Sequence, residues 1–158
     1  GKTNFSCCNL CRYFIKNFGK MFGKSRNFGI HNKTLERWFF KRKVDEKSLI
    51  TGFLIGLTGP GVNYASANYK WFTSRYESFL YVDRVVVDES SWGQGNGRRF
   101  YEALVSSGTD QPFMCAEVNI KPRNDRSLGF HEKFGFVPVG EQDTEGGSKR
   151  VQMMEYKI

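Results

Sequence analysis

The sequence lacks any apolar run long enough to cross a membrane: none of its hydrophobic stretches approaches the roughly 20 residues that a spanning helix needs. The N-terminal part also lacks the apolar segment of a secretory signal peptide, because Lys16, Lys20 and Lys24 interrupt every candidate. The chain has 158 residues, 39% of them hydrophobic and 25% charged, which is typical of one globular domain with a buried core. We therefore expect a single domain over residues 1–158, soluble and cytoplasmic, with no membrane partner.

Residues that form disulfides or bind metals are also scarce. The four cysteines, Cys7, Cys8, Cys11 and Cys115, are too few and too clustered for a disulfide framework, and the cytosol keeps thiols reduced. Cys8 and Cys11 have the spacing of half a zinc site. A structural zinc takes four ligands, however, and the sequence offers no second such pair and only two histidines. We expect neither disulfides nor a bound metal.

Acidic residues are nearly absent from the first part of the chain. Residues 1–43 contain seven Lys and four Arg against Glu36 alone, an excess of ten positive charges. Because the whole chain carries +8, the other 115 residues carry a net −2. Between residues 8 and 24, apolar side chains recur at helical spacing with basic residues between them, which predicts an amphipathic surface helix. Nucleic-acid or membrane-surface binding by its basic face is the alternative.

The rest of the chain has patterns of both strands and helices. Residues 79–87 are apolar on both faces except for Asp83 and Arg84, so we expect a central strand. A helix over 98–105 and a strand over 113–119 follow, and together the three segments predict a right-handed parallel crossover. Further elements are expected as a strand pair over 38–44 and 49–57, a helix over 127–134 capped by Asn124 or Asp125 and ended by Gly135, and a hairpin of 136–139 with 149–158 across Gly146 and Gly147.

An aromatic segment over residues 63–78 separates the first strand pair from the central strand. It carries five rings, those of Tyr64, Tyr69, Trp71, Phe72 and Tyr76. We expect a loop, and a loop of this length inside a compact domain usually serves function. Packing of the rings against the core is the alternative.

A glycine-rich turn follows the central strand. Gly93, Gly95 and Gly97 leave the backbone amides open, and the helix that follows adds its positive end and the charges of Arg98 and Arg99. This combination favours binding of a diphosphate. The turn lacks the Gly-Lys-Ser/Thr ending of a P-loop and comes after a late strand with no ribose-binding acid about 20 residues on, so neither a P-loop nor a dinucleotide fold is expected.

Two motifs about thirty residues apart together resemble the GNAT acyltransferase superfamily. The first is Trp92-Gly93-Gln94-Gly95-Asn96-Gly97, and the second is Asn124-Asp125-Arg126-Ser127-Leu128-Gly129-Phe130-His131-Glu132-Lys133-Phe134-Gly135-Phe136. The resemblance covers residues 49–158, and the stretches 52–54, 79–84 and 117–119 look closer still to a subgroup of predicted acetyltransferases. It does not extend to the basic residues 1–43, a region that usually helps to wall the acceptor site in this superfamily.

The resemblance implies an α/β (α+β) fold: a mixed, mostly antiparallel sheet flanked by helices and splayed between strands 79–87 and 113–119, with acetyl-CoA in the opening. It also implies a set of coenzyme contacts. The diphosphate would bind the backbone amides of Gln94, Gly95, Asn96, Gly97 and Arg98, with charge from Arg98 and Arg99, and the pantetheine arm would bind strand-edge amides of Val85, Val86 and Val87 and, from the far side, Asn124. For the two arginines, a solvated helix face is the alternative.

Acetyl transfer to an amine needs a base for the ammonium and an acid for the departing thiolate. Glu117 lies in an otherwise apolar strand, where burial raises a carboxyl pKa, and it is our candidate base. Asp83 is the rival base, and pairing of either acid with Arg84 is the structural alternative. His131 stands where the superfamily usually has the tyrosine acid, so we expect it, or a tyrosine of the aromatic segment, to supply the proton. Trp92 replaces the usual Arg or Gln and is a second departure.

The sequence therefore predicts an N-acetyltransferase. It would move acetyl from acetyl-CoA to a primary amine, in a small molecule or at a peptide or protein N-terminus, by direct attack in a ternary complex. Cys115 is expected in the core and not as a nucleophile. Two other functions stay open: a GNAT-like acyl-CoA sensor without turnover, and a nucleic-acid-associated protein that uses its basic N-terminal third. Formation of a homodimer is also left open.

Overall fold

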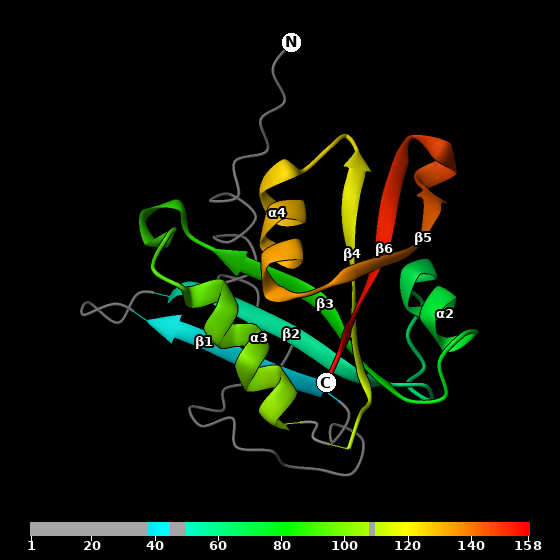
Figure 1. Ribbon diagram of the computed structural model, residues 1–158, viewed down its shortest axis with the longest axis horizontal. Helices are drawn as coiled ribbons and strands as arrows, with labels where there is room; N and C mark the ends of the chain where they lie inside the picture. The colour runs from blue at the N-terminus through cyan, green and yellow to red at the C-terminus, as the bar shows by residue number, and fades with distance from the viewer. Residues whose placement is uncertain (1–37, 45–49, 108–109) are drawn as a thin grey trace.

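A computed structural model describes residues 38–44, 50–107 and 110–158 of the chain (Figure 1). The amphipathic helix expected over 8–24 and the connection between the first two expected strands lie outside the described residues. The strands are β1 (Trp38–Val44), β2 (Ile50–Gly59), β3 (Phe79–Val87), β4 (Phe113–Lys121), β5 (Val137–Thr144) and β6 (Lys149–Lys157). The helices are α2 (Ala67–Thr73), α3 (Asn96–Ser107) and α4 (Asp125–Phe134), with 3-10 turns η1 (Glu89–Ser91) and η2 (Glu145–Gly147).

The six strands form one sheet in the order β1-β2-β3-β4-β6-β5. All neighbours are antiparallel except β3 and β4, which are joined by α3 as the expected parallel crossover. The paired residues of β3 and β4 are Leu80 with Met114 and Tyr81 with Cys115. Beyond these pairs the two strands diverge, and α4 lies over the opening (Figure 1). The mixed, mostly antiparallel, splayed sheet predicted from the sequence is confirmed.

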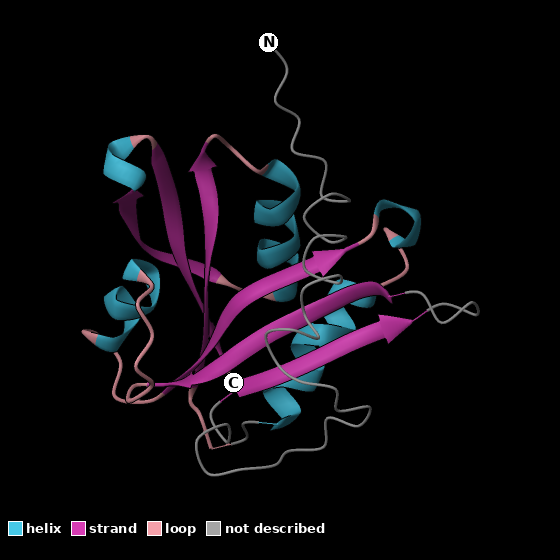
Figure 2. Cartoon of the chain, turned by 180° about the vertical axis from the view of Figure 1, so that it is seen from behind, coloured by secondary structure: helices cyan, strands magenta, loops and turns pink. Residues whose placement is uncertain are grey.

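Each face of the sheet carries its own core because successive strand residues point to opposite sides. On one face, Leu80 and Val82 pack with the buried side chains of α3 and α4. On the other face, Phe79 and Tyr81 pack with Tyr69 and Phe72 of α2 and with Met153 of β6. Figure 2 shows from behind how α2 lies apart from α3 and α4. An opening between β3 and β4 is thus bordered by helices on both faces.

Several expected elements are longer in the structure: α4 begins at Asp125, β2 ends at Gly59 and β4 ends at Lys121. Three other elements also differ from the sequence-based expectations. The aromatic segment contains helix α2, which the Ser66 hydroxyl caps by accepting a bond from the Tyr69 amide at 3.3 Å. Helix α3 begins at Asn96 instead of Arg98. Strand β5 extends to Thr144 because its polar second half pairs with β6 across a register shift next to Gly140. The sequence pattern was too short in the first case and too polar in the last to reveal these elements.

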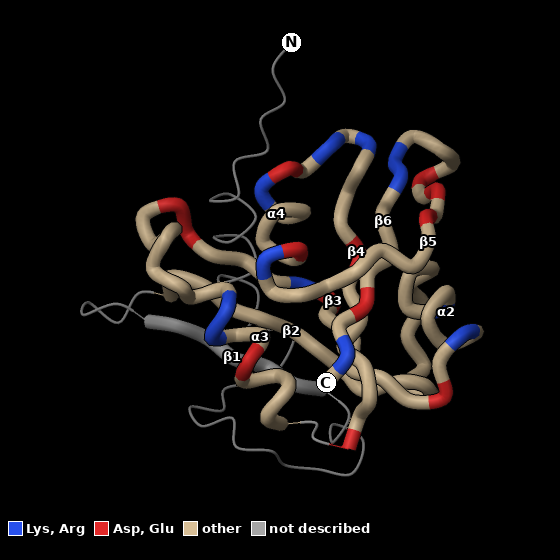
Figure 3. The backbone as a smooth tube through the Cα atoms, viewed as in Figure 1, with Lys and Arg blue, Asp and Glu red and all other residues tan. Residues whose placement is uncertain are grey.

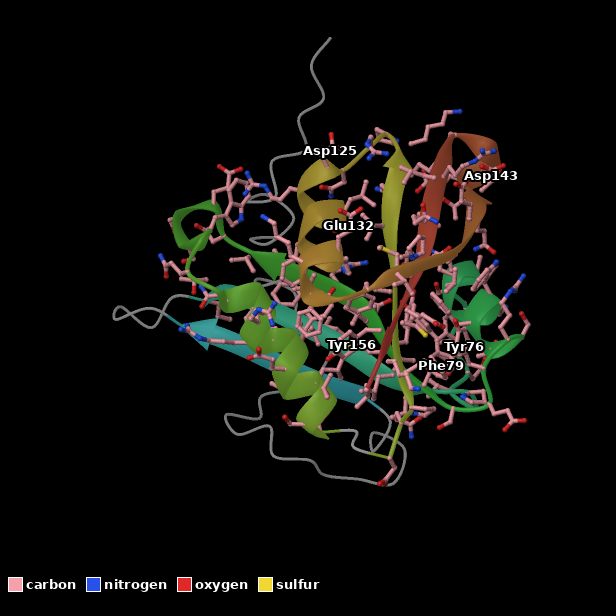
Figure 4. The ribbon with its side chains drawn as sticks, in the orientation of Figure 1. Tyr76, Phe79, Asp125, Glu132, Asp143 and Tyr156 are labelled. Atoms are coloured by element: carbon pink, nitrogen blue, oxygen red, sulfur yellow. The ribbon has the colours of Figure 1, made fainter. Side chains whose placement is uncertain are left out.

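Packing of the aromatic rings against the core, the alternative to a functional loop, holds for part of the segment. Tyr69 and Phe72 are almost fully buried and pack against Phe79 with ring centroids 5.7 and 6.1 Å away. Tyr76 and Phe79, labelled in Figure 4, are neighbours with centroids 6.0 Å apart. The side chains of Tyr69, Phe72 and Tyr76 thus attach α2 and the residues after it to Phe79 of the sheet, so α2 is held at a fixed place beside β3.

Candidate active site

The glycine turn between β3 and α3 has the backbone that its sequence requires. Gly93 and Gly95 have φ angles of +74° and +76°, a region that side chains with a Cβ atom disfavour. A Cβ atom at either position would still meet nothing within 4 Å, so the space above the turn is open. The turn is closed from below by the Asn96 side chain, which is buried and donates to the Ser91 carbonyl oxygen at 3.2 Å.

This arrangement fits the diphosphate of a coenzyme. The turn leads directly into α3, whose first amides have no partner within the helix and carry the positive end of its dipole. Gly97 lies in the first turn of α3, where a Cβ atom would come 3.2 Å from the ring of Phe130. The absence of a side chain at this position therefore allows α3 and α4 to approach closely beside the open amides.

A bulge in β3 places Asp83 out of register next to the opening of the sheet. Val82 pairs with Gly56 and Arg84 pairs with Ile55, so Asp83 is an extra residue on β3. The alternation of faces shifts as a result: Val82 faces the core under α3, and after the bulge Val85 and Val87 also pack on that core. Residues 85–87 lie where β3 has left β4, and one edge of their backbone faces the opening.

Glu117 is in β4, on the face of the sheet that also carries Tyr81. Its Oε1 atom accepts a hydrogen bond from the Tyr81 hydroxyl at 3.0 Å. Its Oε2 atom is buried and has no hydrogen-bond partner among the described residues. Burial raises the pKa of Glu117 to about 7, with a further rise from the charge of Asp83, while Asn68 and Tyr81 oppose the shift. At neutral pH this carboxyl group can therefore both accept and release a proton.

Asp83 is hydrogen-bonded to a tyrosine of the aromatic segment. The Tyr64 hydroxyl donates a hydrogen bond to Oδ1 of Asp83. Burial raises the pKa of Tyr64, and the bond to Asp83 raises it further, so this hydroxyl stays protonated at neutral pH. Among the described residues Asp83 and Glu117 each have a tyrosine partner, and neither forms an ion pair with Arg84. Tyr64 with Asp83 and Tyr81 with Glu117 are thus two carboxylate–tyrosine pairs on the side of the sheet that faces α2, and Tyr76 with Glu155 of β6 is a third.

His131, the expected acid, is in the core between α3 and α4. It is 3% exposed, and its Nδ1 atom lies 2.7 Å from the Ser127 carbonyl oxygen, which only accepts hydrogen bonds. Nδ1 therefore carries the proton, and Nε2 accepts from the Tyr101 hydroxyl at 2.9 Å. Burial lowers the pKa of His131, so the ring is neutral at pH 7. The structure does not bring His131 to the face that carries Glu117 and Asp83.

The other predicted coenzyme contacts lie in different settings. Arg98 is turned toward the end of α4, where it donates to the Lys133 carbonyl oxygen at 3.3 Å and pairs with Glu102 at 3.5 Å. Arg99 is exposed on the first turn of α3. Asn124 caps α4 by accepting a bond from the Ser127 amide at 3.1 Å, as one of the two expected caps. Gln94 is exposed, and its side chain donates to the Ser90 carbonyl oxygen at 3.3 Å.

Sequence reasoning missed Tyr81 and Asn68 near Glu117, and it did not distinguish Tyr64 from the other tyrosines of the aromatic segment. Tyr81 was read only as part of an apolar strand, although it shares the strand face of Asp83 before the bulge. Asn68 is in the helix that the sequence did not predict, and its Oδ1 atom accepts a bond from Gln142 of β5 at 2.7 Å. Tyr64 was one of several aromatic residues with no distinguishing signal. Only the fold brings these segments to one place.

The described residues contain neither a metal-binding cluster nor a membrane-spanning helix. Within residues 38–44, 50–107 and 110–158, no group of three or more His, Cys, Asp or Glu side chains is arranged to hold a metal ion. No helix in the same ranges is long and apolar enough to cross a membrane. Cys115 is fully buried, and burial raises its thiol pKa, so it is a protonated core residue as expected.

A parallel crossover with an open glycine turn, followed by a sheet that splays beside it, defines the acyl-CoA-dependent acyltransferase fold that the motifs implied. The sequence profile described as "Acetyltransferase (GNAT) family" matches residues 12–136. The chain therefore belongs to the GNAT acetyltransferase family. The match begins within the basic N-terminal part, which sequence reasoning had left outside the resemblance.

Solved structures of GNAT acetyltransferases have the same fold. Arabidopsis thaliana NAA60, in complex with a bisubstrate analogue, superposes with a TM-score of 0.64 at 14% identity, over 98% of this chain and 94% of the other. Nourseothricin acetyltransferase gives 0.59 at 15% identity, over 77% and 65%. A provisionally assigned streptothricin acetyltransferase of Bacillus anthracis str. Ames, in complex with acetyl coenzyme A, gives 0.59 at 15%, over 78% and 64%.

These comparisons establish the family and the fold. The chain spans slightly less than two thirds of the nourseothricin and Bacillus proteins. Comparison with curated protein sequences finds no relative. Acetyl transfer is the activity of the family. The donor, the acceptor and the catalytic residues of this chain are inferred from the geometry of its own site.

Proposed function

We propose that this protein transfers the acetyl group of acetyl-CoA to a primary amine by direct attack, with Glu117 as the general base. The observation that carries the proposal is the Glu117 carboxyl group. It is buried in the opening of the sheet with Oε2 unpartnered among the described residues and with a pKa raised to about 7. A base that titrates near the working pH is the most effective kind for proton transfer.

The reaction assigns a destination to each proton and bond. An amine with an ordinary pKa near ~10 reaches the site as an ammonium ion and loses a proton to ionised Glu117. The neutral nitrogen then attacks the thioester carbonyl carbon, and the carbon–sulfur bond breaks. The nitrogen gives up its second proton as the amide forms, and that proton passes to the departing thiolate, so the one proton released overall is the proton on Glu117. No covalent intermediate on the protein is needed, which is consistent with the buried, protonated thiol of Cys115.

The donor side of the proposal rests on the glycine turn. Gly93 and Gly95 leave open space above the amides that lead into α3, and the edge of residues 85–87 faces the opening of the sheet. A diphosphate on the turn would direct an extended pantetheine arm along that edge toward Glu117. The acceptor would approach from the side of α2, past Asp83 and Tyr64. Neither a small amine nor a peptide N-terminus is favoured by these contacts.

The proton donor to the thiolate is a separate question. His131 is neutral, and both of its ring nitrogens are already paired in the core. The Tyr64 hydroxyl, which donates to Asp83 from the aromatic segment, is the alternative acid that the sequence left open. We favour Tyr64 because its hydroxyl lies beside Asp83, on the face of the sheet that carries Glu117, whereas His131 lies in the core under the other face. A Tyr64→Phe variant that loses kcat while keeping coenzyme affinity would support it.

The first experiment is calorimetric titration of the protein with acetyl-CoA, beside Gly97→Glu and its control Gly97→Ala. Both variants introduce the Cβ atom that meets Phe130, but only Gly97→Glu adds negative charge beside the amides. We expect the parent and Gly97→Ala to bind and Gly97→Glu to lose binding. Failure of a folded parent to bind would sink the acyltransferase proposal.

The second experiment measures CoA-thiol release with a panel of primary amines. For the parent, kcat/KM should rise with pH through an apparent pKa near 7, the value for Glu117. Glu117→Gln should lose this step and fall by roughly 100-fold or more, as for removal of a general base. Coenzyme binding without turnover for any amine would favour the acyl-CoA sensor instead.

A further inference from the structure

A cation is stacked on the residue that opens the glycine turn. The guanidinium carbon of Arg126, in the first turn of α4, lies 3.4 Å from the centroid of the Trp92 ring. The ring is itself held in place, because Trp92 Nε1 donates to the Val87 carbonyl oxygen at 2.9 Å. Planar guanidinium groups stack well on tryptophan. The stack therefore connects the end of β3, the glycine turn and the start of α4.

The contacts between the two helices place Arg126 at the open end of α3. Trp92 contacts Arg126, Gly97 is closest to Phe130, and Arg98 reaches Lys133. The contacts follow the same order along both segments, so α3 and α4 begin at the same end. In Figure 3, positively charged segments mark the first turn of α4 and the loop that precedes it.

The donors of Arg126 are not used within the described part of the chain. Its interaction there is the stack on Trp92, and it forms no ion pair with residues 38–44, 50–107 or 110–158. The neighbouring acid, Asp125, is already paired with Arg123 at 2.6 Å; Figure 4 shows Asp125 at the beginning of α4. Stacking covers one face of the guanidinium but leaves the N–H groups at its edge available.

We propose that Arg126, held on Trp92, binds a phosphate group of the coenzyme. The proposal rests on the proposed function, since it takes acyl-CoA as the ligand. Guanidinium N–H groups form short, charge-assisted bonds with phosphate oxygens. The ring fixes the side chain before binding, which reduces the conformational entropy lost on association. Trp92 is a positioning residue that acts through Arg126. The guanidinium of Arg98 is instead turned toward the other end of α4, where it contacts the Lys133 carbonyl oxygen.

The test is calorimetry on the full chain with CoA and with 3′-dephospho-CoA. Arg126→Gln should weaken CoA binding by about ten- to a hundredfold, the effect of losing a charged hydrogen bond. Arg123→Gln is the matched control. Arg123 lies three residues before Arg126, carries the same charge and is already paired with Asp125. The CoA affinity of this variant should stay within about twofold of the parent. A loss seen with both ligands assigns the diphosphate; a loss confined to CoA assigns the 3′-phosphate.

The positioning role of Trp92 is tested by a double-mutant cycle. Trp92→Ala should weaken CoA binding nearly as much as Arg126→Gln, and the double variant should be no weaker than Arg126→Gln alone. Thermal unfolding of each variant checks that it is folded. The proposal is overturned if folded Arg126→Gln binds CoA within twofold of the parent, or if Arg123→Gln loses as much. A parent that binds no CoA instead overturns the proposed function on which the inference rests.

Discussion

The carboxyl group of Glu117 lies on the face of the sheet that carries the buried side chains of Cys115 and Tyr81. Burial raises its pKa from an ordinary 4.5 to about 7. The folded protein therefore binds this proton more tightly than the unfolded chain does. Because of this linkage, the contribution of Glu117 to the free energy of unfolding decreases as pH rises from about 4.5 to 7.

Glu117→Gln should consequently stabilise the protein while it removes activity. The amide keeps an oxygen for the Tyr81 hydroxyl and carries no charge to desolvate. We expect the variant and the parent to be similar near pH 4.5, and the variant to be more stable by roughly 3 kcal/mol at pH 8, from the size of the pKa shift. Urea unfolding across this pH range measures the difference.

Glu132→Gln is the control for that experiment, since Glu132 is exposed on α4. It should follow the parent at every pH. A Glu117→Gln protein that is no more stable than the parent at pH 8 would show that the carboxyl group is better solvated than its position in the structure implies.

Helices α3 and α4 are joined through a polar pair inside an aromatic cluster. His131 of α4 accepts a bond from Tyr101 of α3, and both rings pack against Phe130 and Phe136. Because the Tyr101 hydroxyl is buried, it depends on His131 for its hydrogen bond. The hydrogen bond between Tyr101 and His131 therefore holds α3, which follows the glycine turn, to α4, which carries Arg126. The motif alone had indicated a catalytic role for His131.

His131→Phe should lower the free energy of unfolding by about 2 kcal/mol, because it leaves the buried Tyr101 hydroxyl without its partner. The double variant with Tyr101→Phe removes that hydroxyl and should recover part of the loss. Urea unfolding at pH 7.5 compares the three proteins. Losses that simply add would contradict a direct coupling between the two side chains.

The stability difference between the parent and His131→Phe should also depend on pH, in a direction that the pKa shift of His131 determines. Burial lowers the pKa of His131 below its ordinary 6.5, so the unfolded chain takes up this proton first as pH falls. The difference in free energy of unfolding between the parent and His131→Phe should have its full value above pH 6.5 and decrease below that pH.

The whole molecule is divided by the opening between β3 and β4. Leu80 and Tyr81 are already paired with β4, whereas residues 85–87 are beyond the last pair. Bound acetyl-CoA should therefore slow amide hydrogen exchange within 85–87 and leave exchange at Leu80 and Tyr81 unchanged. Mass spectrometry of peptides from β3, with and without acetyl-CoA, measures this. Equal protection along the strand would indicate general stabilisation instead of a ligand in the opening.

The sequence alone was sufficient for features that depend on neighbouring residues. The apolar run over 79–87 became β3 with the same bounds, Asn124 caps α4, and Gly135 ends that helix in a left-handed conformation. Gly93 and Gly95 have the positive φ angles that their turn requires. These outcomes follow from backbone conformation and local hydrogen bonds, which a few consecutive residues determine.

Burial and pairing between distant segments needed the tertiary structure. The sequence could name Glu117 and His131 as candidates, but their environments come from residues tens of positions away. Glu117 meets Tyr81 across the sheet, and desolvation makes it a group that titrates near pH 7. His131 meets Tyr101, and the same physical effect makes it a neutral core residue. Desolvation depends on everything packed around a group, so only the folded chain could assign the two residues to different environments.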